Sequence, residues 1–183
     1  MRFDKLTTKF QQALGDAQSL AVAGDNAYIE PQHLLLAMLD DAEAGVGGLL
    51  ARAGVNVPAL KAGLKSAIER LPRVQGHGGE ITVSRDLANL LNAADKIAMK
   101  LGDEFIASEL FLSALSQDKG ETGRLLKEHG GNHASIQAAI DAVRGGENVN
   151  SADAEGQREA LKKYTMDLTE RARQGKLDPV IGR

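Results

Sequence analysis

The chain has 183 residues, enough for one domain of about 100 to 150 residues with a sizeable core and for additional segments. It contains no cysteine, which excludes disulfides and thiolate metal sites, and its opening, MRFDKLTTKF, has no apolar stretch typical of a leader. A net charge of −3, only six aromatic residues (four Phe and two Tyr) and no apolar run longer than residues 34–39 predict a cytoplasmic protein without nucleic-acid or membrane partners.

The first half of the chain reads as four helices. Apolar residues at spacings of three and four predict a helix over about residues 6–23, with Gly24 suited to the C′ position. Pro31 fits the first turn of a second helix, because its missing N–H costs nothing there. A short third helix is expected to end at Gly54, and a fourth to start near Asn56, a good N-cap residue.

The second half reads in the same way. Residues 72–83 are expected to form an exposed connection with a short strand-like bridge, and Ser84 is expected to cap a fifth helix. Three more helices should follow. Glycines mark the predicted stops of the last four helices, at Gly102, Gly120, Gly130 and Gly145.

The two halves are related by an internal repeat. Ile29 matches Ile106 at an offset of 77, and after a one-residue deletion Leu34 matches Leu110 at an offset of 76. This period exceeds the roughly 20 to 50 residues of solenoid units. We therefore expect an all-α fold in which two pseudo-symmetric four-helix repeats, about residues 4–72 and 84–144, pack as one eight-helix bundle within a domain of residues 1–144.

Beyond the repeats the composition changes. Residues 145–157 are acidic and glycine-rich with one isolated valine, which is too little apolar surface to favour an ordered structure, so a flexible linker is expected. Residues 158–183 are net basic and begin with helix-forming sequence, which predicts a short helix.

No catalytic, metal or cofactor site is expected in this chain. His129 and His133 are four residues apart, but the glycines between them break the helix that would align them, and His33 and His77 have no ligand at a useful spacing. The glycine-rich segments 45–48 and 76–79 lack the phosphate-binding spacing, and no nucleophile elbow is present.

Surface recognition remains as a functional class. The seam between two pseudo-symmetric half-bundles can leave a shallow apolar groove where an extended peptide docks. The alternative is that every apolar stripe belongs to the core, since a stripe at helical spacing normally faces inward.

Several segments resemble the Clp family of AAA+ protein-disaggregating chaperones. The opening MRFDKLTTKFQQALGDAQSLA, the segments YIEPQHLLLAML and FIASELFLSAL, and the ending LKKYTMDLTERARQGKLDPVIGR carry the resemblance over the whole chain. It implies a Clp N-terminal double-repeat domain, then a mobile linker, then, over residues 158–183, the incomplete start of the first ATPase module. The implied function is recognition of unfolded or aggregated polypeptide, which is threaded by a hexameric ATPase ring in stress recovery.

The resemblance also implies particular residues for substrate binding. Polar residues associated with substrate engagement match Thr7, Asp103 and Glu109, and an apolar groove matches Ala93, Ile97 and Leu110. Ala93 is smaller than the residue common there. Asp103 and Glu109 also have purely local interpretations, because Asp103 follows a helix-ending glycine and an acidic residue such as Glu109 favours a helix N-terminus.

Cofactors and partners are implied only for the full-length parent. Val180 and Ile181 match a segment beside the adenine, so ATP and Mg would bind in the parent, which would be a homohexamer working with a DnaK-type chaperone. The 183-residue chain by itself is expected to bind no cofactor and not to be an enzyme. The alternative is an adaptor-docking module of a protease-linked Clp unfoldase; a stand-alone hydrolase would need a clustered catalytic set.

Overall fold

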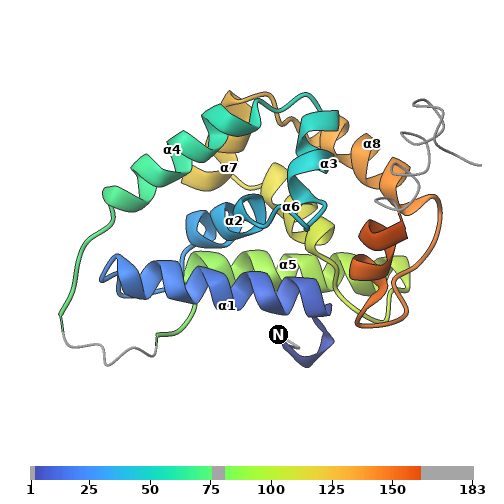
Figure 1. Ribbon diagram of the computed structural model, residues 1–183, viewed down its shortest axis with the longest axis horizontal. Coiled ribbons are helices and arrows are strands. Elements are labelled where there is room, and N and C mark those ends of the chain that lie inside the picture. Colours follow the sequence, from blue (N-terminus) through green and yellow to red (C-terminus); the bar gives the residue numbers. More distant parts are fainter. Residues whose placement is uncertain (1–2, 76–80, 162–183) are drawn as a thin grey trace, which may run out of the picture.

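The computed structural model describes residues 3–75 and 81–161, and the described residues form an all-α fold, as predicted (Figure 1). Residues 154–161 are helical as well, after an irregular segment that follows the last named helix. The helices are η1 (Phe3–Lys5), α1 (Thr8–Ala23), α2 (Pro31–Asp40), α3 (Val46–Arg52), α4 (Val57–Glu69), α5 (Arg85–Leu101), α6 (Ser108–Ser116), α7 (Glu121–Glu128) and α8 (His133–Arg144).

The helix starts follow local capping rules. The side chains of Asn56, Ser84 and Asn132 accept hydrogen bonds from backbone N–H groups in the first turns of α4, α5 and α8. Pro31 is the first residue of α2, as predicted.

Two of the predicted glycine stops differ in the structure. The left-handed residue after α1 is Asp25, with φ of 55°, whereas Gly24 has φ of −89°. Gly120 does not end α6, which stops at Ser116; it precedes α7 as its N-cap. Gly102 and Gly145 do end α5 and α8 in the left-handed conformation.

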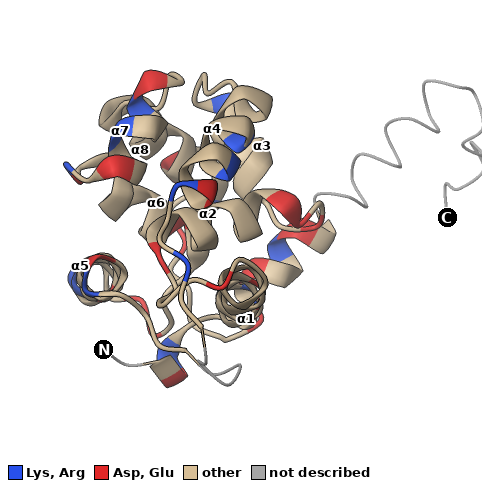
Figure 2. Ribbon diagram, turned by 90° about the vertical axis from the view of Figure 1, so that its left-hand side faces the viewer, with Lys and Arg blue, Asp and Glu red and all other residues tan. Residues whose placement is uncertain are grey.

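The repeat is visible in the packing. Helix α1 packs on α2 as α5 packs on α6, and α2 packs on α4 as α6 packs on α8. Contacts between repeats obey the same symmetry, because α3 packs on α8 and its counterpart α7 packs on α4. Figure 2 views α1 and α5 nearly end-on, on opposite sides of the lower half of the molecule, with α2 and α6 above and between them.

Two parallel bridges tie the repeats together. Leu6, before α1, pairs with Ile106, after α5, and Val83, before α5, pairs with Ile29, after α1. These bridges are symmetry counterparts, since the repeat offset of 77 relates Leu6 to Val83 and Ile29 to Ile106. The strand-like bridge predicted between the repeats is therefore one of a pair.

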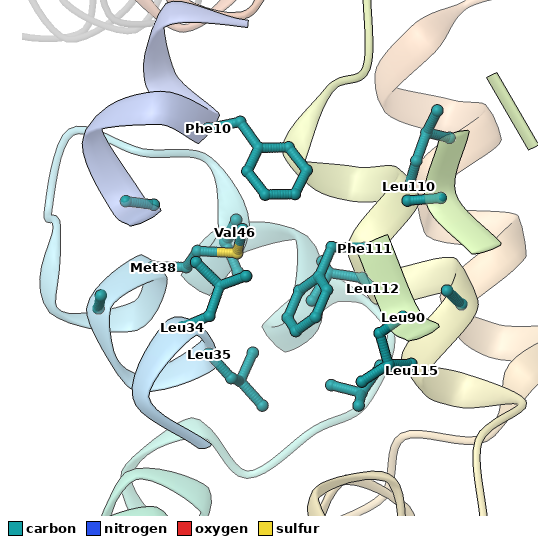
Figure 3. Packing of buried hydrophobic residues seen from close by; sticks show 14 of the residues in the cluster. Phe10, Leu34, Leu35, Met38, Val46, Leu90, Leu110, Phe111, Leu112 and Leu115 are labelled. Atoms are coloured by element: carbon teal, nitrogen blue, oxygen red, sulfur yellow. The ribbon is translucent and has the colours of Figure 1, made fainter. Parts of the chain in front are cut away.

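One core spans both repeats. Phe10 of α1 meets Phe111 of α6 edge to face, with ring centroids 6.3 Å apart, and Leu34, Met38 and Val46 lie around them (Figure 3). Most of the predicted apolar stripes are thus core, as the alternative interpretation held.

Candidate functional site

An open groove of about 430 Å³ lies between α5, α6, α8 and the residues that follow α8. Ile97 of α5, Leu110 of α6 and Ile140 of α8 contribute its apolar lining, and Leu101, which is 48% exposed, stands at its edge. Lys100, Gln137, Asp141 and Glu147 are among its polar lining residues. The groove therefore combines an apolar interior with a polar rim, which suits a chain that carries both kinds of side chain.

A larger groove of about 590 Å³ lies between α1 and α2, but its character differs. Leu20 and Ala37 are its apolar residues, and Asp16, Asp40 and Asp41 make its rim acidic. We therefore assign the candidate site to the groove on α5, α6 and α8.

The structure brings two of the three predicted groove residues into this groove. Ile97 and Leu110 both line it. Ala93 lies one helical turn before Ile97 on α5 and is packed partly buried against the core, outside the groove lining.

The three predicted polar residues lie elsewhere, in a buried polar cluster. We use this name for Thr7, Asp103, Glu109, Arg144, Glu155 and Arg158. Thr7, Asp103 and Glu109 are 0%, 6% and 3% exposed. Their side chains are engaged with partners that come later in the sequence, so none of the three is presented at the surface in this structure.

Ion pairs hold one side of the polar cluster. Arg144 Nη2 donates to Asp103 Oδ2 at 2.6 Å, and Arg144 Nε lies 3.8 Å from Glu109 Oε2. Arg158 donates to both carboxylate oxygens of Glu109, from Nη2 to Oε1 at 2.8 Å and from Nη1 to Oε2 at 3.2 Å. Burial, the largest single effect, opposes the charge of Arg158, but the contact with Glu109 and the charges of Glu155 and Glu159 together raise the pKa of the guanidinium.

Hydrogen bonds to Glu155 hold the other side of the polar cluster. Its Oε1 accepts hydrogen bonds from the Thr7 hydroxyl at 2.7 Å and from the Ser108 backbone N–H at 3.0 Å. The side chain of Thr7 in turn accepts from Phe10 N–H and caps α1. Burial raises the pKa of Glu155, and the nearby Glu109 carboxylate adds to the rise.

Glu155 also supplies what the second repeat lacks. The residue before α6 is Ala107, which corresponds to Glu30 of the first repeat at the offset of 77 and cannot cap a helix with its side chain. The carboxylate of Glu155 meets the first N–H of α6 instead. A later segment thereby completes the N-terminus of a helix in the repeat domain.

The segment between α8 and Glu155 is tethered by contacts as well. Val149, which is 2% exposed, accepts hydrogen bonds from Glu104 and Phe105 N–H and donates to Asp103 Oδ1. Its counterpart in the first repeat is Arg73, which bridges to Asn26, the counterpart of Asp103. The contacts of the second repeat thus continue past residue 144; the flexibility of residues 145–157 stays a prediction.

Sequence reasoning missed Arg144, Glu155 and Arg158. The sequence offered two signals: the isolated Val149, and Glu155 and Arg158 at a spacing of three within helix-forming sequence. Val180 and Ile181 lie outside the described residues, as does His77. Among residues 3–75 and 81–161 no three His, Asp or Glu side chains cluster to hold a metal ion, and no helix there could cross a bilayer.

Three comparisons relate the chain to known proteins. A model of the Clp repeat (R) N-terminal domain matches residues 5–129. The chaperone protein ClpB of Vibrio cholerae is 49% identical over 183 residues, which is 100% of this chain and 21% of the relative. The chain therefore spans about a fifth of the length of such relatives.

Solved structures share the fold. The Hsp104 N-terminal domain of Candida albicans superposes with a TM-score of 0.73 at 22% identity, covering 82% of this chain and 99% of that one. A ClpV N-domain solved with a VipB peptide gives 0.63 at 23% identity, covering 84% and 91%. The matched family is that of a repeat domain, in agreement with the expectation that these residues are not an enzyme. The chain belongs to the Clp repeat N-terminal domain family.

Proposed function

We propose that this domain binds unfolded or aggregated polypeptide in the groove on α5, α6 and α8. The observation that carries the proposal is the groove itself, with Ile97 and Leu110 inside and Leu101 exposed at its edge, on a chain that is 49% identical to a ClpB chaperone. A ClpV N-domain of similar fold holds a peptide, which supports peptide binding by this fold.

The proposal extends to the parent protein. There the domain would deliver the bound chain to a homohexameric AAA+ ATPase that uses ATP and Mg and works with a DnaK-type chaperone in the cytoplasm. Several weak sites on one ring raise the effective concentration of client chain, so each groove can bind weakly.

The substrate-binding residues proposed are Ile97 and Leu110, with Ala93 supporting the groove wall through α5. Thr7, Asp103 and Glu109 would contribute through the polar cluster, which reaches the groove at Arg144, a residue that lines it. Docking of a folded adaptor protein is the alternative occupant.

The test is an NMR titration of the 183-residue chain with one protein in its native and in a stably unfolded form. We expect amides near Ile97 and Leu110 to shift only with the unfolded form. Leu101→Asp should weaken binding roughly tenfold, since the groove loses one apolar contact. Met99→Asp is the matched control, because Met99 is 59% exposed on the same helix and does not line the groove.

Two results would count against the proposal. If Leu101→Asp and Met99→Asp weaken binding of the unfolded protein equally, nonspecific hydrophobic contact and not the groove governs binding. Shifts with the native form alone would favour a folded adaptor.

A further inference from the structure

Residues 152–158 cover part of the polar cluster through polar contacts. The Ala152 carbonyl accepts from Thr8 N–H at 2.9 Å, and Asp153 Oδ1 accepts from the Thr8 hydroxyl at 3.0 Å. Glu155 then covers Thr7 and the start of α6, and Arg158 covers Glu109. In Figure 1 this stretch includes the first part of the orange-red helical segment at the right of the molecule.

We infer that residues 152–158 form an intramolecular latch, whose release uncovers Thr7 and Glu109 for a client polypeptide. The inference rests on the proposed function, because it assigns the regulation of the same binding region. In the latch, the guanidinium of Arg158 binds the Glu109 carboxylate. A ligand that competes for this carboxylate is therefore an extended chain that offers Arg or Lys next to apolar residues.

The latch contains little that would hold it permanently. Its one buried residue is Glu155, a carboxylate, and no apolar residue between 150 and 161 is buried. Ordering a chain segment costs conformational entropy that buried apolar area normally offsets. Arg158 Nε also lies buried without a hydrogen-bond partner among the described residues, so the latch leaves one polar atom unsatisfied.

The latch differs in this respect from the segment before it. Val149 is buried, repeats a contact of the first repeat and stays bound to Asp103 when the latch opens. Release therefore has a defined boundary between Val149 and Ala152. It frees Glu109 from Arg158, while Arg144, paired with Asp103 and 3.8 Å from Glu109 Oε2, remains at the groove.

A reversible covalent lock tests the latch. Because the chain has no cysteine, the double variant Thr8→Cys/Asp153→Cys places a single disulfide across the latch of the 183-residue protein. We expect the oxidised form to bind a stably unfolded, arginine-containing protein at least tenfold more weakly than the reduced form of the same variant. Equal affinity of the two forms would overturn the latch.

A second variant opens the latch without a crosslink. Arg158→Glu removes the ion pair with Glu109. The Ser108 amide, which donates to Glu155, should then exchange its hydrogen at least tenfold faster, and binding of the unfolded client should become tighter. Arg52→Glu, the same charge change at an exposed position of α3, should alter neither.

Hydrogen exchange of the Ser108 amide distinguishes a failure of the latch from a failure of the proposed client-binding function. Unchanged Ser108 exchange in Arg158→Glu would overturn the latch whatever the binding result. If no form of the protein binds unfolded chain, the proposed function fails, and faster Ser108 exchange in Arg158→Glu still supports the latch.

Discussion

Arg144 Nη2 lies 2.6 Å from Asp103 Oδ2, and both side chains are almost fully enclosed, at 7% and 0% exposure. The same Arg144 lines the groove and lies near Glu109. This pair therefore joins the two regions in which sequence resemblance had placed substrate-binding residues. It fixes the end of α8 against the loop after α5, so we expect its role to be structural before it is functional.

Removal of Asp103 should be costly. Asp103→Ala leaves the Arg144 guanidinium buried without its closest partner, and loss of one member of a buried pair costs about 3 to 5 kcal/mol. Urea denaturation should show this loss as a lower midpoint. Asp40→Ala breaks the more exposed pair with Lys61 and should cost under about 1 kcal/mol. Equal losses in the two variants would contradict the buried-pair interpretation.

Phe10 and Phe111 should be energetically coupled across the repeats. Their counterparts are Leu87 and Leu35, so leucine is the natural replacement at each position. In a double-mutant cycle of Phe10→Leu and Phe111→Leu, we expect a coupling of about 0.5 to 1.5 kcal/mol from the edge-to-face contact. The exposed Phe3, replaced in the same way, should be additive with Phe111→Leu. Additivity in both cycles would show that the contact contributes nothing beyond buried area.

Acid should destabilise the fold through His33. This side chain is fully buried, its Nδ1 accepts from Glu30 N–H, and Nε2 meets Asn26 Oδ1, an arrangement that requires the neutral ring. Burial lowers the pKa of His33 to about 4. Between pH 6.5 and about 4 the unfolded chain binds a proton that the folded protein does not, so stability falls as pH falls, by about 3 kcal/mol in total.

His33→Gln isolates this contribution. Glutamine suits the third position of a helix as a capping partner and does not titrate. The free energy of unfolding, measured in urea from pH 7 to 4, should depend less steeply on pH in the variant. The same steepness in both proteins would exclude His33 as the source.

Much of the fold could be predicted because its signals are local. The caps at Asn56 and Ser84, the proline that begins α2 and the repeat offset are all readable within a few residues or by self-comparison. The stop after α1 could not be assigned to one residue, because Asp tolerates the left-handed conformation that Gly24 was expected to adopt.

The polar cluster was less readable because its contacts join distant residues. Thr7 and Glu155 are 148 positions apart, and Glu109 and Arg158 are 49 apart. A local pattern identifies a residue as polar and places it near a helix end, but it does not reveal which distant charge will cover it. Resemblance named Thr7 and Glu109, and the structure adds their partners.

The docking of residues 152–158 should weaken as pH rises. Burial and the Glu109 carboxylate raise the pKa of Glu155, while the neighbouring Arg158 favours its ionised form. A group whose pKa is raised in the docked state binds its proton more tightly there. Its contribution is complete below the ordinary glutamate pKa and is lost as pH rises through the raised value.

Glu155→Gln keeps an oxygen that can accept from Thr7 and Ser108 and removes the charge. Hydrogen exchange of the Ser108 amide, corrected for intrinsic pH dependence, should show greater protection at pH 5 than at pH 7.5 in the unmodified protein. In Glu155→Gln the protection should be the same at both values and should exceed that of the unmodified protein at pH 7.5. Protection that rises with pH in the unmodified protein would mean that the ionised carboxylate, held by Arg158, is the docked form.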